Sequence, residues 1–397
     1  MSDGPLAHIK VIDLCLARAG PTCVRALADM GADVIQVVRP GDASFDARFP
    51  NSDRENLHRN KRSVAIDLQS EAGHEVFLRL ARDADVVVEN YRPDVKRRLR
   101  VDYETLRPLN PRLVYASISG FGQSGPYADR AGVDQIAQGL GGLMSVTGDP
   151  DSGLPWRVGI PISDLAAGMF LAQGVLVALI ERERSGEGQW LHTSLLEAMI
   201  AMMDFQATRW LIDGEVPPQA GNDHPTMFPM GVFRTADGMI NIAASSGRMW
   251  PSFLEAIEAP ELAQDARFRD GRSRAQNRVA LRGECEKRLA ERTSAEWIER
   301  LNAVGVPSGP ILTVDKTFAD PQVQHLEMVW TVDSFRHGKL RILRSPVTLT
   351  RTPARARRAA PVGGQDTEAV LAEYGYAPGE IAALQETGVV GRSPGQA

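Results

Sequence analysis

Asp164 is the residue whose position in the sequence most clearly needs a chemical explanation. From Leu165 to Ile180 every residue except Gln173 is apolar or glycine, and Asp164 stands directly before this run. A charge placed there caps a helix, pairs with another charge or carries chemistry. Two interpretations stay open from the residues alone. Ser163 or Asp164 caps a helix, or Asp164 is a partly desolvated carboxylate that acts as a nucleophile.

A second group of polar residues follows predicted buried strands. Arg39 ends one such strand, Asn90 and Tyr91 follow another, and Arg98 lies in the basic segment that comes next. Ligands of open α/β sheets bind at the carboxyl ends of the strands, and arginine offers planar paired donors to phosphate. These residues therefore indicate a site for a phosphorylated ligand. For each of them taken alone, a solvated surface side chain remains the alternative.

Several other kinds of site are not indicated. The turn Leu14–Cys23 lacks the glycine pattern that binds a dinucleotide, and neither a P-loop nor a G-x-S-x-G turn occurs. The seven histidines do not fall at metal-ligand spacing, and the three cysteines form no paired motif. We therefore expect no metal site, no dinucleotide-binding turn and no P-loop.

Composition restricts the class of protein. The chain has 397 residues, 43% of them hydrophobic and 24% charged, with a net charge of −5. This balance is typical of a soluble globular protein and argues against nucleic acid as a partner. The few cysteines and the lack of a signal-peptide pattern favour the cytoplasm. The apolar run after Asp164 is shorter than the roughly 20 residues that span a bilayer, so we expect a buried helix and no membrane partner.

The elements that must hold these residues alternate between strands and helices. Strands are expected at His8–Leu14, Ala32–Val38, Ser63–Leu68, Ala84–Tyr91 and Arg112–Gly122, and helices at Gly20–Met30 and Ser70–Ala81. This alternation predicts a doubly wound α/β fold with a parallel sheet. Further along, we expect helices at Asp164–Arg184, Leu195–Leu211 and Asp366–Tyr374 and a strand at Gly188–Leu195. The segment Asp213–Gly231 is rich in Pro and Gly, as is typical of a linker or binding loop, and Asp237-Gly238 indicates a hairpin turn.

Many segments together resemble one family. The matching blocks are VIDL, AGP, DMGADVIQVVRPG, NKRSVAIDL, ADVVVENYRP, LNPRLVYASISGFGQSGPY, GLMSVTG, IPISDLAAGM, RSGEGQ, TADGMINIA and GVPSGP, which run through nearly the whole chain. In this order they resemble the class III CoA-transferases, also called the CaiB/BaiF family, which includes formyl-CoA:oxalate and carnitine CoA-transferases. A series of blocks in a fixed order is more specific than any single motif.

The resemblance implies a role for Asp164. The family's nucleophilic aspartate begins the helix after a comparable segment, so Asp164 would attack an acyl-CoA thioester to form a mixed anhydride. The released CoA thiolate would then form an aspartyl-CoA thioester, from which CoA passes to a carboxylic acid. The resemblance implies that the coenzyme A thioester is a substrate and that no metal or other cofactor is bound. The implied partners are acyl-CoA and small carboxylic acids.

The resemblance also implies where the substrates bind. CoA contacts would come from Arg18, Ala19, Arg39, Asn90, Tyr91 and Arg98. A loop that covers the active site would include Gly221, Asn222, His224 and Gly231. Arg18 stands where formyl-CoA transferase has a glutamine, which indicates an acid other than oxalate.

The implied fold is an α/β fold with a large Rossmann-like domain, built from both chain ends, and a smaller inserted α+β domain. The expected boundaries are residues 1–212 for the first part of the large CoA-binding domain, 213–231 for a linker and active-site loop, 232–320 for the small domain, 321–345 for a second linker and 346–397 for the return to the large domain. Two subunits would interlock as a homodimer.

Two alternative functions remain. α-Methylacyl-CoA racemases share this fold and use a histidine to move a proton at the α-carbon, but Val133 stands at that position here. A CoA-binding protein without catalysis is the other alternative, and the intact sequence around Asp164 argues against it.

Overall fold

The computed structural model describes residues 4–41, 51–334 and 336–392 of the chain. The chain divides into two compact units. The large unit comprises Met1–Leu143, Val158–Asp204 and Leu326–Ala397, and the small unit comprises Met144–Arg157 and Phe205–His325. Both ends of the chain therefore belong to the large unit.

The predicted parallel sheet is confirmed in the large unit. Its strands are β1 (Lys10–Asp13), β2 (Asp33–Val38), β3 (Lys61–Ala65), β4 (Val86–Glu89), β5 (Val114–Ser119) and β6 (Trp190–Ser194), in the order β3-β2-β1-β4-β5-β6. The inner strands β2, β1, β4 and β5 are buried on both faces, as parallel strands must be when helices cover them, whereas the edge strand β6 is largely exposed. The strand order reverses between β1 and β4, and such a switch point leaves a crevice at the strand ends where ligands bind.

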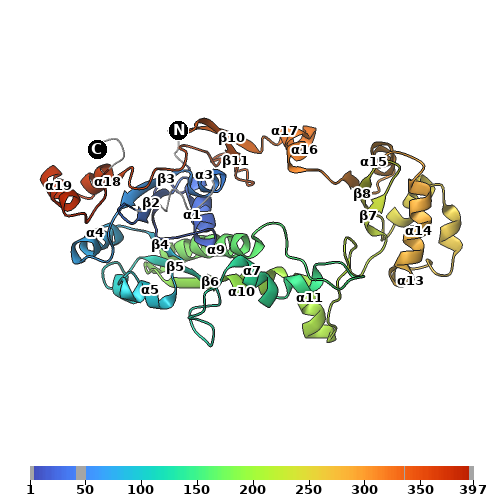
Figure 1. Ribbon diagram of the computed structural model, residues 1–397, viewed down its shortest axis with the longest axis horizontal. Helices are drawn as coiled ribbons and strands as arrows, with labels where there is room; N and C mark the ends of the chain where they lie inside the picture. Colours follow the sequence, from blue (N-terminus) through green and yellow to red (C-terminus); the bar gives the residue numbers. More distant parts are fainter. Residues whose placement is uncertain (1–3, 42–50, 335, 393–397) are drawn as a thin grey trace. The chain divides into compact units, whose positions relative to one another are not determined.

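Helices cover both faces of this sheet (Figure 1). Val86 and Val88 pack with α1 (Ala19–Asp29) and α9 (Ile162–Ser185) on one face, which also receives α7 (Asp134–Leu140) and α10 (Leu195–Met202). Val87 faces the other way and packs with α4 (Glu71–Arg82), α18 (Thr367–Glu373) and α19 (Pro378–Glu386). Successive strand residues point to opposite faces, so each strand contributes to both cores.

The end of the chain covers the edge strand β3. A carboxylate oxygen of Asp366 accepts the backbone N–H of Ser63 at 2.8 Å, and the hydroxyl of Thr367 accepts the N–H of Ala65 at 3.1 Å. These bonds occupy edge groups that would otherwise pair with another strand.

Helix α9 is buried on one face only, although we expected a buried helix. It begins at Ile162 and ends at Ser185, with Gly186 in the left-handed conformation at φ 77°. By length and composition it could cross a membrane, and half of its most apolar window is buried. Half of the buried residues are alanine or glycine, which allow close packing, whereas large apolar side chains such as Met169, Val177 and Ile180 are exposed.

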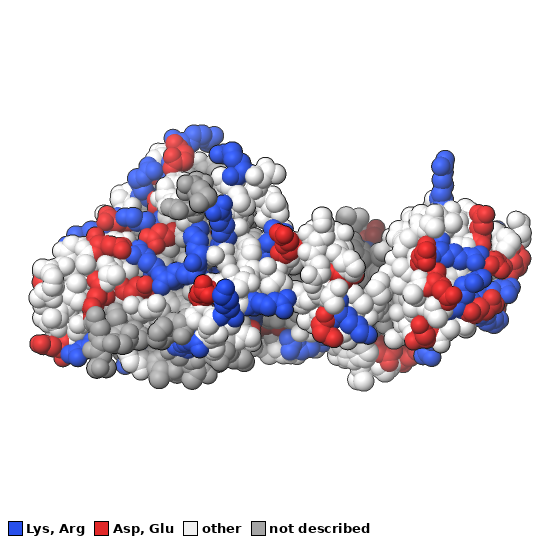
Figure 2. Space-filling model, turned by 90° about the horizontal axis from the view of Figure 1, so that it is seen from above, with Lys and Arg blue, Asp and Glu red and all other residues white. Residues whose placement is uncertain are grey.

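The small unit has its own sheet and core. The hairpin expected at Asp237-Gly238 is present, because β7 (Met230–Arg234) pairs antiparallel with β8 (Met239–Ala243), and β8 pairs with β9 (Ser308–Pro310). Its helices are α12 (Met249–Ala256), α13 (Gly271–Gln276), α14 (Arg278–Leu289), α15 (Ser294–Ala303), α16 (Val314–Ala319), α17 (Pro321–His325) and a short 3-10 turn at Pro260–Gln264. In Figure 2, basic and acidic side chains are intermixed around α13–α15, and several of them form ion pairs such as Lys287–Glu284.

Three segments differ from the sequence expectation. The helix expected at Leu195–Leu211 is broken into α10, α11 (Asp204–Thr208) and a π-helical turn at Arg209–Asp213, and Asp204 has a positive φ of 43°. The strands β10 (Val329–Ser334) and β11 (Gly338–Leu343) form a hairpin within 321–345, where we expected a linker. Residues 144–157 belong to the small unit.

The remaining helices are α3 (Asn51–His58), α5 (Pro93–Arg98), α6 (Tyr103–Leu106) and α8 (Leu143–Val146).

Candidate active site

Asp164 lies in the first turn of α9 but does not cap the helix. The N-cap position is Pro161, whose side chain cannot accept a hydrogen bond. The first turn is instead capped by Asp134 of α7, whose Oδ1 accepts the backbone N–H of Ser163 at 3.0 Å and its hydroxyl at 2.7 Å. Because another carboxylate does this work, Asp164 is not needed for capping. The positive end of the helix still favours its ionised form.

The surroundings of Asp164 change its affinity for a proton. The pKa of this carboxyl is raised to about 6, mainly by burial and also by the negative charge of Asp134, while the Arg18 guanidinium lowers it. A carboxylate in this setting is ionised near neutral pH yet poorly solvated. Such a group is suited to nucleophilic attack on a thioester.

Helix α7 also holds the backbone that leads into α9. The side-chain oxygen of Gln138 accepts the N–H of Val158 at 2.9 Å, and its Nε2 donates to Asp134 at 2.7 Å. Gln138 is fully buried, so these bonds fix the entry to the helix. Sequence reasoning did not find Asp134 or Gln138. Their spacing of four residues on a helix is the available signal, and it is a weak one.

Arg18 stands at the start of α1 and pairs with Asp53 of α3. Arg18 Nη2 lies 2.5 Å from Asp53 Oδ2. Arg18 directly follows Ala17, whose φ is positive at 58°. Helices α1 and α9 touch immediately beyond this point, because a Cβ on Gly168 would lie 2.5 Å from the carbonyl oxygen of Ala19. The close contact brings the starts of the two helices together, and Ala19 itself is buried in it.

A cavity of about 270 Å³ lies at the switch point of the large sheet. Leu16 follows β1, Arg39 follows β2 and Tyr91 follows β4, and all three line this cavity. The structure therefore brings Arg39 and Tyr91 together, as their positions after the strands predicted. Arg98 lies at the exposed end of α5 and does not line the cavity.

Asn90 orders the turn beside this cavity. Its Oδ1 accepts the N–H of Leu16 at 2.8 Å, and its Nδ2 donates to the carbonyl of Leu16 at 2.6 Å. The residue before it, Glu89, accepts the N–H of Tyr91 at 2.8 Å and pairs with the buried Lys96 at 2.9 Å. Asn90 therefore shapes the wall of the cavity through the backbone of Leu16.

The four predicted loop residues lie together in the small unit. Gly221, Asn222, His224 and Gly231 all line a cavity of about 640 Å³. The ring of His224 stacks on Phe205 at 5.8 Å, and its Nδ1 accepts the N–H of Met227 at 3.2 Å. Burial and the nearby Arg278 lower the pKa of His224. Gly231 is needed for space, since a Cβ there would lie 2.3 Å from a carboxylate oxygen of Asp223.

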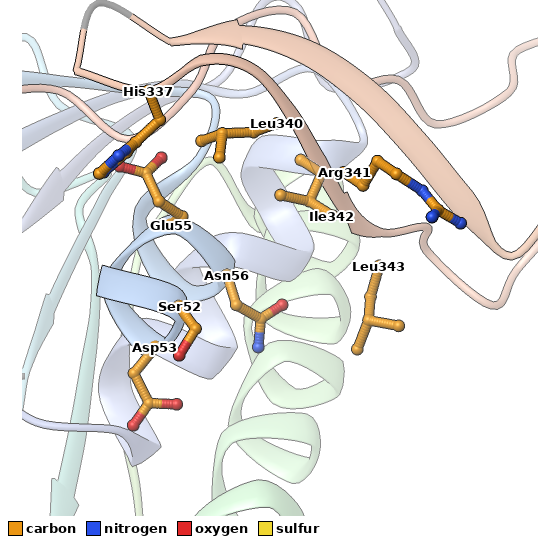
Figure 3. A pocket seen from close by; sticks show the side chains of 9 residues that line it. All are labelled: Ser52, Asp53, Glu55, Asn56, His337, Leu340, Arg341, Ile342 and Leu343. Atoms are coloured by element: carbon orange, nitrogen blue, oxygen red, sulfur yellow. The ribbon is translucent and has the colours of Figure 1, made fainter. Parts of the chain in front are cut away.

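A third cavity, of about 560 Å³, lies between α3 and the hairpin β10–β11. Figure 3 shows its lining, which combines apolar side chains of β11 with Asp53 and Glu55 of α3 and His337 of the hairpin. Asp53, the partner of Arg18, is therefore among the residues that line this cavity. Within the described part of the chain, no group of three or more His, Cys, Asp or Glu side chains is arranged to hold a metal ion.

Comparison with known proteins agrees with this geometry. A sequence model described as CoA-transferase family III matches residues 6–367. The chain is 37% identical over 383 residues to a succinate–glutarate CoA-transferase of Agrobacterium fabrum, which covers 93% of this chain and 95% of that protein. It is 37% identical over 333 residues to an acetyl-CoA:oxalate CoA-transferase of Acetobacter aceti, which covers 82% and 85%. A crystal structure of a CaiB/BaiF family protein from Brucella suis matches with a TM-score of 0.83 at 34% identity and covers 94% of this chain and 100% of that one. The chain thus belongs to CoA-transferase family III.

Proposed function

We propose that this protein moves CoA from an acyl-CoA donor to a carboxylic acid, with Asp164 as the nucleophile. The observation that carries the proposal is the setting of Asp164 in the first turn of α9. Its carboxylate is half-buried, its pKa is raised to about 6, and the Arg18 guanidinium acts on it. Membership of family III supports the class of reaction.

The reaction runs through two kinds of covalent intermediate on Asp164. A carboxylate oxygen of Asp164 attacks the carbonyl carbon of the acyl-CoA thioester. The C–S bond breaks, CoA departs as its thiolate, and a mixed anhydride between Asp164 and the first acid remains. The thiolate attacks the aspartyl carbonyl, which releases the first acid and forms an aspartyl-CoA thioester. The second acid attacks this thioester and expels CoA, and the thiolate then attacks the acyl carbon of the new anhydride and frees Asp164. No proton or electron is gained or lost overall. Each step has a lower barrier than direct transfer of CoA between the two acids would have.

The nucleotide end of CoA is proposed to bind in the cavity at the switch point. Arg39 supplies a guanidinium for a phosphate group, and Leu16 and Tyr91 supply apolar walls for the adenine. Asn90 acts through the turn that it holds. Arg98 at the end of α5 is proposed to contact phosphate from outside the cavity.

The acid is proposed to be a short dicarboxylate, with succinyl-CoA as donor. Relatives carry the names succinate–glutarate CoA-transferase and succinyl-CoA:mesaconate CoA-transferase, which supports this class. The loop with Asn222 and His224 is proposed to contact the acyl group or the acid, since both side chains face a cavity. We also propose that the enzyme is a cytoplasmic homodimer.

Trapping with hydroxylamine tests the proposed nucleophile. When the enzyme is incubated with succinyl-CoA and hydroxylamine, mass spectrometry of peptides is expected to find a hydroxamate on Asp164. Asp164→Asn should lose the adduct and lose CoA exchange by a factor of about 10³ or more, as for other covalent nucleophiles. Asp151→Asn, which removes an exposed carboxylate, serves as the control. Full exchange in Asp164→Asn, or deuterium exchange at the α-carbon of a branched acyl-CoA without any acid, would contradict the proposal.

A further inference from the structure

We infer that Arg18 binds the carboxylate of the acid substrate and that Asp53 competes with the substrate for Arg18. The inference rests on the proposed CoA-transferase function, because it concerns the acid that gives up or takes CoA. It assigns Arg18 to the acid, and it gives Asp53 the role of an internal competitor.

The ion pair between Arg18 and Asp53 is single and partly open to water. One nitrogen of Arg18 meets one oxygen of Asp53 at 2.5 Å, and the two side chains are 21% and 35% exposed. The pair Arg62–Asp33 differs, since Nε and Nη2 of Arg62 bond to both oxygens of Asp33 at 3.0 and 2.6 Å. Guanidinium and carboxylate fit best through two parallel bonds. A substrate carboxylate can therefore bind Arg18 in a better geometry than Asp53 does.

Two other ion pairs of the large unit are buried too deeply for exchange. Lys61 and Asp13 form a pair at 2.8 Å in which both side chains are fully buried, and Arg59–Asp29 is buried almost as deeply. Breaking a buried pair leaves an uncompensated charge, whereas a partly exposed pair contributes little to stability and its ions are readily hydrated. Among these pairs, Arg18–Asp53 is the one that a dissolved anion can reach and replace.

An acid that approaches Asp164 as a carboxylate needs a cation beside Asp164 to offset charge repulsion. An acid that attacks an acyl group on Asp164 brings a carboxylate toward a site where Asp134 is already negative. Of the charged groups that act on Asp164, Arg18 is the one that opposes the negative charge. Arg18 therefore offsets the repulsion that the incoming acid meets.

Asp53 has space to move when it loses Arg18. Its side chain lines the cavity of about 560 Å³ between α3 and the hairpin β10–β11 (Figure 3). The released carboxylate can turn into this opening and remain hydrated. Exchange therefore does not require the helices to separate.

Chemical labelling of Arg18 tests the competition directly. Phenylglyoxal modifies accessible guanidinium groups, and peptide mass spectrometry follows the modification of Arg18 in the full-length protein with increasing succinate. We expect succinate to protect Arg18. In Asp53→Asn the unprotected rate should rise about threefold and the half-protecting succinate concentration should fall about threefold, as for the loss of a partly exposed ion pair.

Matched variants make the test specific. Asp33→Asn removes the carboxylate of another arginine pair and should change the labelling of Arg62 but not that of Arg18. Asp53→Glu keeps a carboxylate and should behave like the natural protein. The exposed Arg269 reports any general effect of succinate on the reagent. Lack of protection of Arg18 by succinate, or an unchanged half-protecting concentration in Asp53→Asn, would overturn the inference. Absence of the hydroxamate on Asp164 would instead overturn the proposed function, whatever Arg18 does.

Discussion

The carboxylate of Asp164 combines two properties that oppose each other. Burial and the charge of Asp134 raise its pKa to about 6, so the group carries its charge with poor solvation, while Arg18 limits the rise. A fully hydrated carboxylate with an ordinary pKa would be ionised over a wider range but would be a weaker nucleophile. The position is therefore a compromise between ionisation near neutral pH and reactivity.

The pH dependence of the first chemical step follows from this pKa. The ionised form of Asp164 attacks the thioester, and its pKa is raised, so activity is present above pH 6 and is lost as the pH falls through that value. We expect kcat/KM for succinyl-CoA to fall about tenfold for each pH unit below 6. Steady-state assays between pH 4.5 and 8, an assay range chosen to bracket the ordinary and raised values, check this expectation. A decrease of kcat/KM that sets in only near the ordinary pKa of a carboxyl group would contradict this expectation.

Asp134→Asn separates the two causes of the raised pKa. The asparagine oxygen can still accept the N–H of Ser163 and cap α9, but the side chain carries no charge and loses the bond from Gln138 Nε2. The decrease of kcat/KM at acidic pH should therefore occur at lower pH in this variant. Circular dichroism checks that the protein stays folded. An unchanged pH dependence would mean that burial alone, and not the charge of Asp134, raises the pKa of Asp164.

At the residue scale, sequence reasoning found side chains that stand in recognisable local patterns. Arg39 and Tyr91 follow buried strands, and the structure brings them together at one cavity. It missed Asp134 and Asp53, because each meets its partner from a distant part of the chain. Asp134 bonds Ser163 from another helix, and Asp53 meets Arg18 although α1 and β2 lie between them in the sequence. A single sequence does not show which helices face each other.

At the scale of elements, the contact between α1 and α9 positions the chemistry. Gly168 lets the carbonyl of Ala19 and the side chain of Thr22 approach α9 closely. The residues at the two helix starts, Arg18 and Asp164, depend on this approach. The exposed face of α9 has no comparable restriction.

Replacement of Gly168 by alanine tests this packing. The new Cβ would lie 2.5 Å from a backbone oxygen, so the helices must separate, and we expect a loss of stability of about 1–3 kcal/mol with a larger loss of kcat. Gly283→Ala in α14 is the matched control, since nothing lies within 4 Å of its added Cβ. This control should be stabilised by about 0.5–1 kcal/mol, because alanine is favoured over glycine inside helices. Thermal unfolding by circular dichroism measures both variants, and equal effects would contradict the packing argument.

The positions of helices and strands could be predicted from the sequence wherever the spacing of apolar residues matches the period of the element. The expected strands and the helices over α1, α4, α9 and α18 are present with small shifts at their ends. The helix expected at Leu195–Leu211 is not continuous, because the chain passes from the large unit to the small unit after Asp204. Periodicity of apolar residues continues across this boundary and so does not reveal it.

At the scale of the whole molecule, the exposed face of α9 is the feature that the single chain leaves unexplained. Met169, Val177 and Ile180 are 56%, 59% and 73% exposed and recur at helical spacing on one side of the helix. Large apolar side chains gathered on a surface mark a place where another surface binds. We propose that a second copy of the chain covers this face, as the proposed homodimer requires.

The oligomeric state tests this explanation. Light scattering after size exclusion should give twice the mass of one chain at micromolar concentration. The double variant Val177→Glu with Ile180→Glu places charges on the exposed face and should shift the protein to the monomer, because a buried unpaired charge is costly at an interface. Val279→Glu, at a position that is 82% exposed in the small unit, should remain dimeric. A natural chain that is monomeric at all concentrations but floats with lipid vesicles would assign the face to a membrane instead. The double variant should then lose flotation and keep its mass, so the two explanations of α9 make opposite predictions for the same pair of substitutions.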